Sequence, residues 1–120
     1  MNKFFGLLII VISCACKHKT NFNSLPTVSY STNIEPVIVS NCTQSGCHGG
    51  EEHRSFSLLS YDDVINHTGI TAGNPDKSKL YKVIDSYNAG TVMPRKPYNK
   101  LTEEQIELIY VWIGQGAKNN

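Results

Sequence analysis

The sequence predicts a small domain built only from α-helices, and three observations support this. No stretch of useful length alternates apolar and polar residues as a half-buried β-strand does. Several short stretches instead carry apolar residues at helical spacing behind a residue type that caps helices. The clearest is the last, where Thr102-Glu103-Glu104-Gln105 has the form of a capping box and Gly114 and Gly116 follow the helix. Its apolar stripe consists of Ile106, Ile109, Tyr110 and Ile113, widened by Leu108 and Trp112.

Length and charge limit what the chain can be. Its 120 residues are enough for one small domain. Hydrophobic residues make up 40% and charged residues 18%, which is ordinary for a globular protein. The formal net charge is only +1, so the composition gives no reason to expect nucleic acid as a partner.

Residues 1–13 have the features of a bacterial export signal. Lys3 supplies the positive start, and the apolar run over 4–12 is too short to cross a bilayer as a helix. The run ends in Val11-Ile12-Ser13-Cys14, which resembles a bacterial lipobox. That resemblance implies cleavage before Cys14 and lipid on its sulfur, which would hold the protein on a membrane. An ordinary signal peptide and an uncleaved anchor are the alternatives, and Cys16 is either an alternative lipid site or a free thiol.

A polar segment follows, and the sequence predicts a lipid-anchored tether over 14–31. From residue 17 onward this segment is rich in Lys, Asn, Ser, Thr and Pro and has no apolar period. His18 lies here, and a mobile tether would position it poorly as a metal ligand. We therefore expect the folded domain to occupy 32–118.

The first helix of the domain is expected to lead to Cys42. The stretch Thr32–Glu35 has the form of a capping box, and apolar residues follow at helical spacing. Pro36 is tolerated only in a first turn, so a helix that begins at Pro36 is the alternative.

Cys42, Cys47 and His48 form the most informative motif in the chain. Two thiols followed directly by a histidine suit covalent haem attachment, in which the thiols add to the haem vinyl groups and the imidazole binds the iron. Here four residues separate the cysteines, whereas the usual motif has two. Positions five apart on a helix point away from each other, so Cys42 and Cys47 cannot both reach one haem from a continuous helix. For both to bind the haem, Thr43–Gly46 must bulge outward. Gly46 can take the positive φ that such a bulge requires.

Three other readings of the two cysteines remain open from the motif alone. They could form a small-loop disulfide in an oxidising compartment. They could bind zinc together with His48, with a fourth ligand from His53 or His67. They could also be inert thiols.

Two further helices are expected in the middle of the chain. One covers Tyr61–Ile65, with Ser60 as its cap. The other covers Pro75–Ser86 and places Leu80 and Ile84 on one face.

A proline-rich stretch carries Met93. Pro94 and Pro97 hold 91–97 out of the helical conformation. A thioether on a stiff loop is a suitable second ligand for a haem iron that His48 binds from the other face. Alternatively Met93 fills a gap in the core, or His53 or His67 takes the distal position.

Several motifs together resemble the small class I cytochromes c, and in particular bacterial cytochrome c-like domains. The resemblance covers roughly 33–117 and departs from the family in the spacing of the two cysteines. The matching motifs, in chain order, are Cys47-His48-Gly49, Leu58-Leu59-Ser60-Tyr61, Gly73-Asn74-Pro75-Asp76-Lys77-Ser78-Lys79-Leu80-Tyr81, Met93-Pro94 and Trp112-Ile113-Gly114-Gln115-Gly116-Ala117.

The resemblance implies one covalent haem c. Cys42 and Cys47 would form the thioethers, His48 would be the proximal iron ligand and Met93 the distal one. It also implies three to four short helices around the haem, with the first and last helices packed together.

The function expected from these features is electron transfer, on the periplasmic side of a bacterial envelope membrane or at the cell surface. Redox proteins of the envelope would be the partners, and no nucleic acid is expected. No acid–base pair or nucleophile stands out in the sequence, so we expect an electron carrier and not an enzyme, with peroxidase-like activity left open. The alternatives are a haem-based enzyme or small-ligand sensor, and a disulfide-stapled structural lipoprotein without haem.

A local excess of basic residues flanks the methionine segment. It could dock an acidic redox partner, or it could simply be a solvated surface. The residues concerned are Lys77, Lys79, Lys82, Arg95, Lys96 and Lys100.

Overall fold

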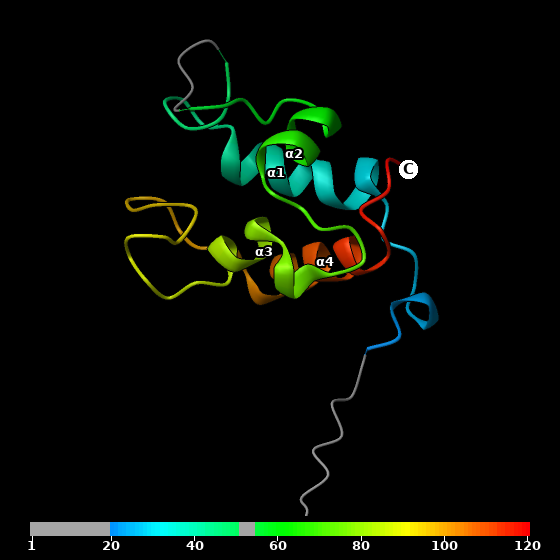
Figure 1. Ribbon diagram of the computed structural model, residues 1–120. Coiled ribbons are helices and arrows are strands. Elements are labelled where there is room, and N and C mark those ends of the chain that lie inside the picture. The colour runs from blue at the N-terminus through cyan, green and yellow to red at the C-terminus, as the bar shows by residue number, and fades with distance from the viewer. Residues whose placement is uncertain (1–19, 51–54) are drawn as a thin grey trace, which may run out of the picture.

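The computed structural model describes residues 20–50 and 55–120, and this part of the chain is helical with no β-strand (Figure 1). The prediction of an all-α class is confirmed for these residues. The expected signal peptide, Cys14, Cys16, His18 and His53 lie outside the described residues. The helices are α1 (Glu35–Cys42), α2 (Tyr61–His67), α3 (Lys79–Ile84) and α4 (Glu103–Gly114), with single turns η1 (Phe22–Ser24), η2 (Tyr30–Ile34) and η3 (Pro75–Lys77).

The first helical segment begins earlier than the capping box at Thr32 suggested. Its N-cap is Ser29, whose hydroxyl accepts a hydrogen bond from the Thr32 N–H, while Asn33 accepts one from the Ser29 N–H. The turn η2 is a wide π-type turn and runs directly into α1. Pro36 follows within α1, and a widened turn before a proline suits its ring and its missing N–H donor.

The second helix agrees with its prediction. Ser60 caps α2 by accepting a hydrogen bond from the Asp63 N–H at 3.1 Å. Asp63 in turn accepts hydrogen bonds from the Ser57 hydroxyl and the Leu59 N–H. These bonds, led by the one from Ser57, lower the pKa of the Asp63 carboxyl.

The helix predicted over Pro75–Ser86 is divided in two at Ser78. This residue has extended backbone angles between η3 and α3, and its side chain is fully buried. Its hydroxyl accepts from the Thr71 N–H at 2.9 Å and donates to the Asn74 carbonyl at 2.9 Å. These local bonds compete with helical bonding, which is why the helix does not run through.

The last helix forms as predicted. Thr102 and Gln105 make a reciprocal capping box, and Gly116 has a φ of +102° just beyond the helix end. The Trp112 indole is buried and donates to the Lys118 carbonyl at 2.9 Å.

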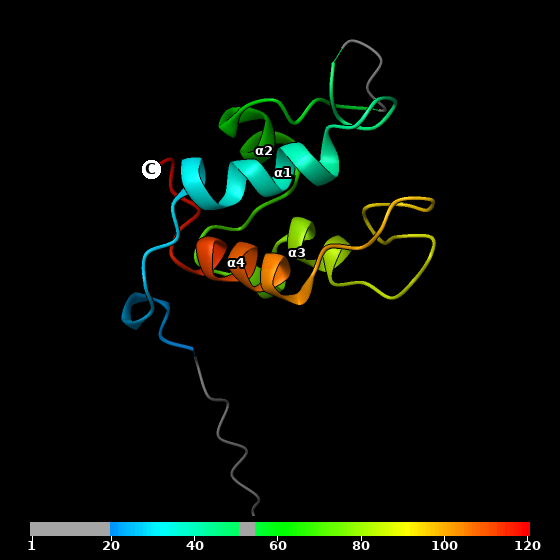
Figure 2. The same ribbon diagram turned by 180° about the vertical axis from the view of Figure 1, so that it is seen from behind.

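The helices enclose one hydrophobic core. Helices α1 and α2 lie on one side of it and α3 and α4 on the other, as both views show (Figures 1 and 2). The η2 turn contacts α4, and the rings of Tyr30 and Trp112 lie 5.6 Å apart. The first and last helical segments therefore touch through the η2 turn. The most deeply buried core side chains are Ile34, Ile38, Val64, Ile84, Ile109, Trp112 and Ile113.

Residues 20–31, the N-terminal strap, pack on the domain although the sequence placed them in a tether. Val28 and Tyr30 belong to the core, and the Phe22 ring lies 5.5 Å from the Tyr110 ring. A Cβ atom at Gly114 would overlap the Phe22 ring, so the glycine permits this approach. Packed structure therefore begins at Phe22 and not at Thr32.

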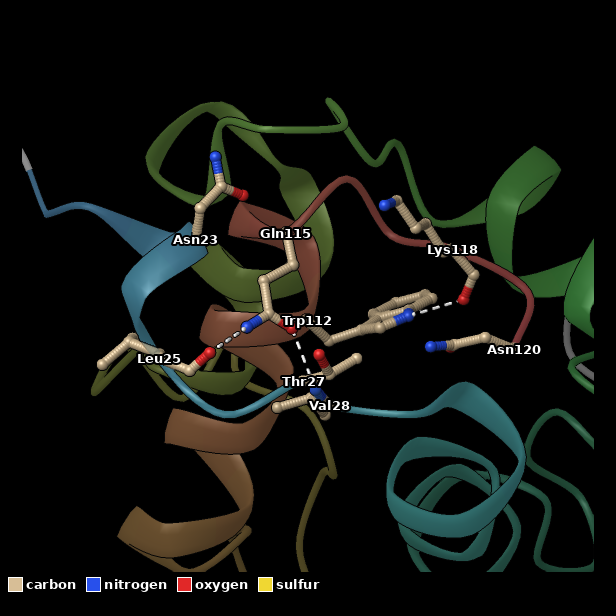
Figure 3. A pocket seen from close by; sticks show the side chains of 8 residues that line it. All are labelled: Asn23, Leu25, Thr27, Val28, Trp112, Gln115, Lys118 and Asn120. Carbon is tan, nitrogen blue, oxygen red and sulfur yellow. Dashed lines mark hydrogen bonds between the residues drawn. The ribbon is translucent and has the colours of Figure 1, made fainter.

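Hydrogen bonds from the C-terminal end of the chain hold the strap (Figure 3). Figure 3 shows that Gln115 accepts from the Val28 N–H at 2.9 Å and donates to the Leu25 carbonyl at 3.5 Å. It also donates to the Pro26 carbonyl at 2.9 Å and the Phe22 carbonyl at 3.2 Å. The Asn120 carbonyl accepts from the Ser31 N–H at 3.0 Å, which ties the last residue of the chain to the same strap. The domain therefore extends to Asn120.

Candidate functional site

Helix α1 ends at Cys42, and the next residues form the bulge that the sequence predicts. The Cys47 N–H donates to the Gln44 carbonyl at 2.8 Å, and the His48 N–H donates to the Cys42 carbonyl at 3.0 Å. The loop therefore closes on itself, and His48 returns to the end of the helix.

Two glycines make this loop possible. Gly46 has a φ of +75°, a conformation that side chains with a Cβ rarely adopt. A Cβ atom at Gly49 would overlap the backbone carbonyl of Thr43, so only glycine fits there without a shift. Residues 43–50, the cysteine loop, therefore have a shape that depends on these two positions.

The His48 ring is oriented by a main-chain carbonyl. Its Nδ1 atom lies 3.0 Å from the carbonyl oxygen of Phe56. A carbonyl only accepts hydrogen bonds, so Nδ1 donates to it, and in the neutral ring the lone pair is then on Nε2. The Leu58 N–H also donates to the His48 carbonyl at 2.8 Å, which holds the two chain segments together. A neutral imidazole held in this way is the usual form of a histidine metal ligand.

Phe56 also covers one face of that imidazole. The two rings are stacked, with centroids 4.4 Å apart and planes 16° apart. On its other side Phe56 lies 5.5 Å from the His67 ring, which is at the end of α2. His67 is thus separated from His48 by an aromatic ring.

Both cysteines of the motif are free thiols and half-buried. Cys42 packs against the core. Burial, and to a lesser extent the nearby Cys47, raise the pKa of the Cys42 thiol to about 11. Cys42 is therefore protonated at neutral pH.

Met93 lies in a long loop between α3 and α4. Its N–H donates to the Val83 carbonyl at 2.9 Å, which fastens the middle of the loop to α3. Its side chain is half-buried. Residues 85–100, the methionine loop, leave the domain at the same end as the cysteine loop, on the left in Figure 1 and on the right in Figure 2.

Clusters of conventional metal ligands are not found in the described residues. Within 20–50 and 55–120, no group of three or more His, Cys, Asp or Glu side chains is placed to hold a metal ion. The zinc alternative named His53, which lies outside this range.

Two hollows of the surface lie away from the motif. One, of about 110 Å³, is enclosed by the strap, Trp112 and Gln115 (Figure 3). The other, of about 490 Å³, lies along α3 and α4. The motif cysteines, His48 and Met93 line neither of them.

The donor set nevertheless suits a haem c. It offers two free thiols, an imidazole whose Nε2 is available, and a thioether on a second loop at the same end of the domain. A haem bound by this set would be held by the end of α1 and the two loops, so it would not require a cluster of three acidic or imidazole side chains.

No protein-family model, no curated protein and no solved structure matches this chain. In the part of the chain that the structure describes, no helix is long and apolar enough to cross a membrane.

One contributor to the site could not be found by reading residue types. The carbonyl of Phe56 orients His48, and any residue supplies a carbonyl. The only available signal was that Phe56 is the first apolar residue after the polar stretch that follows the motif.

Proposed function

We propose that this chain is a haem c electron carrier of the bacterial envelope, with a domain similar to the small class I cytochromes c. The hydrogen bond from His48 Nδ1 to the Phe56 carbonyl carries the proposal. It fixes the tautomer in which Nε2 can bind iron, directly beside the cysteine that precedes it.

The residues that would hold the group lie at the end of α1, in the cysteine loop and in the methionine loop. Cys42 and Cys47 would bind it covalently, His48 would be the proximal ligand and Met93 the distal ligand. When bound, the haem supplies an iron that gains and loses one electron.

The protein's own part is to fix and shield these groups. The Phe56 carbonyl holds the His48 ring in one orientation, and the Phe56 ring covers one face of it. The cysteine loop, which follows Cys42 and carries Cys47 and His48, is shaped by Gly46 and Gly49. A ligand with restricted motion reorganises little on electron transfer, which suits a carrier.

An electron carrier is favoured over an enzyme because His48 and Met93 would both bind the iron, which would leave it no position open to a substrate. A haem enzyme or gas sensor would require Met93 to leave the iron.

The strap suggests how the domain faces the membrane. The strap, at the blue end of the described chain, lies away from the two loops (Figures 1 and 2). If lipid is attached at Cys14, the six residues from there to Thr20 span at most about 20 Å. The domain would then lie close to the membrane, with its two loops turned away from it and accessible to redox proteins of the envelope.

The experiment is to express the full chain together with a bacterial haem-attachment system and record its visible spectrum. A six-coordinate low-spin spectrum is expected for the wild-type protein, and His48→Ala should abolish it. Met93→Ala should keep the haem but bind carbon monoxide strongly when reduced. Strong carbon monoxide binding by the wild-type protein would favour the sensor or enzyme alternative. A colourless protein with a Cys42–Cys47 disulfide would favour the structural lipoprotein.

A further inference from the structure

A second feature of the surface lies along α3 and α4, separate from the motif. It is the hollow of about 490 Å³, which we call the acidic groove. Four exposed carboxylates line it, from Asp76, Asp85, Glu103 and Glu107, against the single ammonium group of Lys100. The groove therefore has a negative charge although the whole chain is almost neutral.

Tyrosine rings form part of its wall. Tyr81 and Tyr110 lie 4.8 Å apart at an angle of 59°, and both are half-buried. Burial, followed by the negative charge of Asp76, raises the pKa of the Tyr110 hydroxyl. Burial, followed by the charge of Asp85, does the same for Tyr81. The charges of Asp76 and Asp85 thus contribute to the raised pKa values of the two tyrosine hydroxyls in the groove.

The chain already places a cation on one of its aromatic rings. The Lys100 Nζ atom lies 3.9 Å from the centre of the Tyr87 ring, in cation–π geometry. Tyr87 is 92% exposed, so folding of the core does not account for its position. Both residues line the groove.

We propose that the acidic groove docks a lysine- or arginine-rich segment of a partner protein. A basic side chain would lie between the carboxylates and over the tyrosine rings, where charge attraction and cation–π contact act together. Lys100 is then an internal competitor that occupies the Tyr87 ring until the partner displaces it. The proposal does not depend on haem. Of the basic residues considered above for an acidic partner, only Lys100 lines this groove.

The test is equilibrium binding of fluorescently labelled hexalysine to the full chain, measured by fluorescence anisotropy at low and physiological salt. The double variant Glu103→Gln/Glu107→Gln should bind about three- to thirty-fold more weakly. Its matched control is Asp62→Asn/Glu104→Gln, which removes the same charge from exposed positions outside the groove. The control should change the affinity by less than about twofold.

Two single substitutions test the aromatic and competitor parts. Tyr87→Leu should weaken binding about two- to fivefold, whereas Tyr98→Leu, in the same loop but outside the groove, should not. Lys100→Gln should strengthen binding, and by more than Lys96→Gln, which removes the same charge outside the groove.

Equal effects of the groove variants and their controls would overturn the proposal, because they would show attraction by overall charge alone. Absence of measurable hexalysine binding by the wild-type protein at low salt would also overturn it. These outcomes are independent of whether the chain carries haem, so they do not bear on the proposed electron transfer.

Discussion

Replacement of Gln115 by alanine tests whether the N-terminal strap is part of the folded domain. The side chain makes four hydrogen bonds to the strap, and the three shortest have donor–acceptor distances of 2.9, 2.9 and 3.2 Å. Each such bond contributes about 0.5–1.5 kcal/mol net, and partial exposure favours the lower half of that range. We therefore expect Gln115→Ala to reduce the free energy of unfolding by about 1.5–3 kcal/mol, with a fall in Tm on the order of 10 °C.

The assay is urea denaturation followed by the emission of Trp112. This is the single tryptophan of the chain, and it is 1% exposed, so unfolding moves it from the core into water. The control is Gln44→Ala, whose side chain makes one local bond of 3.0 Å to Ser40. It should cost no more than about 0.5 kcal/mol. If the two variants lost equal stability, the strap would contribute nothing and the domain would begin near Thr32 after all.

Three further predictions concern the candidate site. In the haem-loaded protein, Met93→Ala should lower the reduction potential, since a thioether ligand raises it; an unchanged potential in a voltammetric titration would assign the distal position to another residue. In the haem-free chain, stability should fall as pH rises above 9, because the pKa of Cys42 is raised from 9.0 to about 11 and that of Tyr30, chiefly by burial, from 10.0 to about 12. Unfolding therefore releases protons in this range, and alkali favours the unfolded state. Urea titrations at pH 8 to 11 should show that Cys42→Ser loses less stability below pH 10 than the wild type does. If the free energy of unfolding fell equally with pH in both proteins, the cause given for Cys42 would be contradicted. Gly49→Ala should destabilise the apo-protein by about 1–3 kcal/mol because its Cβ would overlap the Thr43 carbonyl; a cost equal to that of Gly90→Ala in the same titration would show that the cysteine loop adjusts freely.

Local chemistry in the sequence was enough to predict those helices whose ends are fixed by nearby residues. The capping box at Thr102 and the cap at Ser60 both form as expected. The prediction of one continuous helix over Pro75–Ser86 was wrong, because the buried hydroxyl of Ser78 bonds to Thr71 and Asn74. A buried serine cannot be told from an exposed one by residue type.

The strap was missed because its partners are distant in the chain. Val28 and Tyr30 stand in a polar, proline-containing stretch, and nothing nearby indicates that Gln115 and Asn120 will bind it. Contacts of that kind depend on how the whole chain closes, which a local pattern does not encode.

One part of the candidate site could likewise be predicted from the local sequence, and another part could not. The bulge after Cys42 was predictable, because Cys42 and Cys47 could not both reach one haem from a continuous helix and Gly46 permits the positive φ of a bulge. The carbonyl of Phe56 was not predictable, since a main-chain acceptor has no residue-type signature.

The most direct test of the central claim is the mass of the denatured full chain after expression with a haem-attachment system. We predict that the protein retains one haem through denaturation, and that peptide mapping places it on the peptide containing Cys42, Cys47 and His48. The Cys42→Ser/Cys47→Ser variant, expressed in the same way, should carry none. A wild-type protein that folds, reaches the membrane and carries no covalent haem would contradict the account.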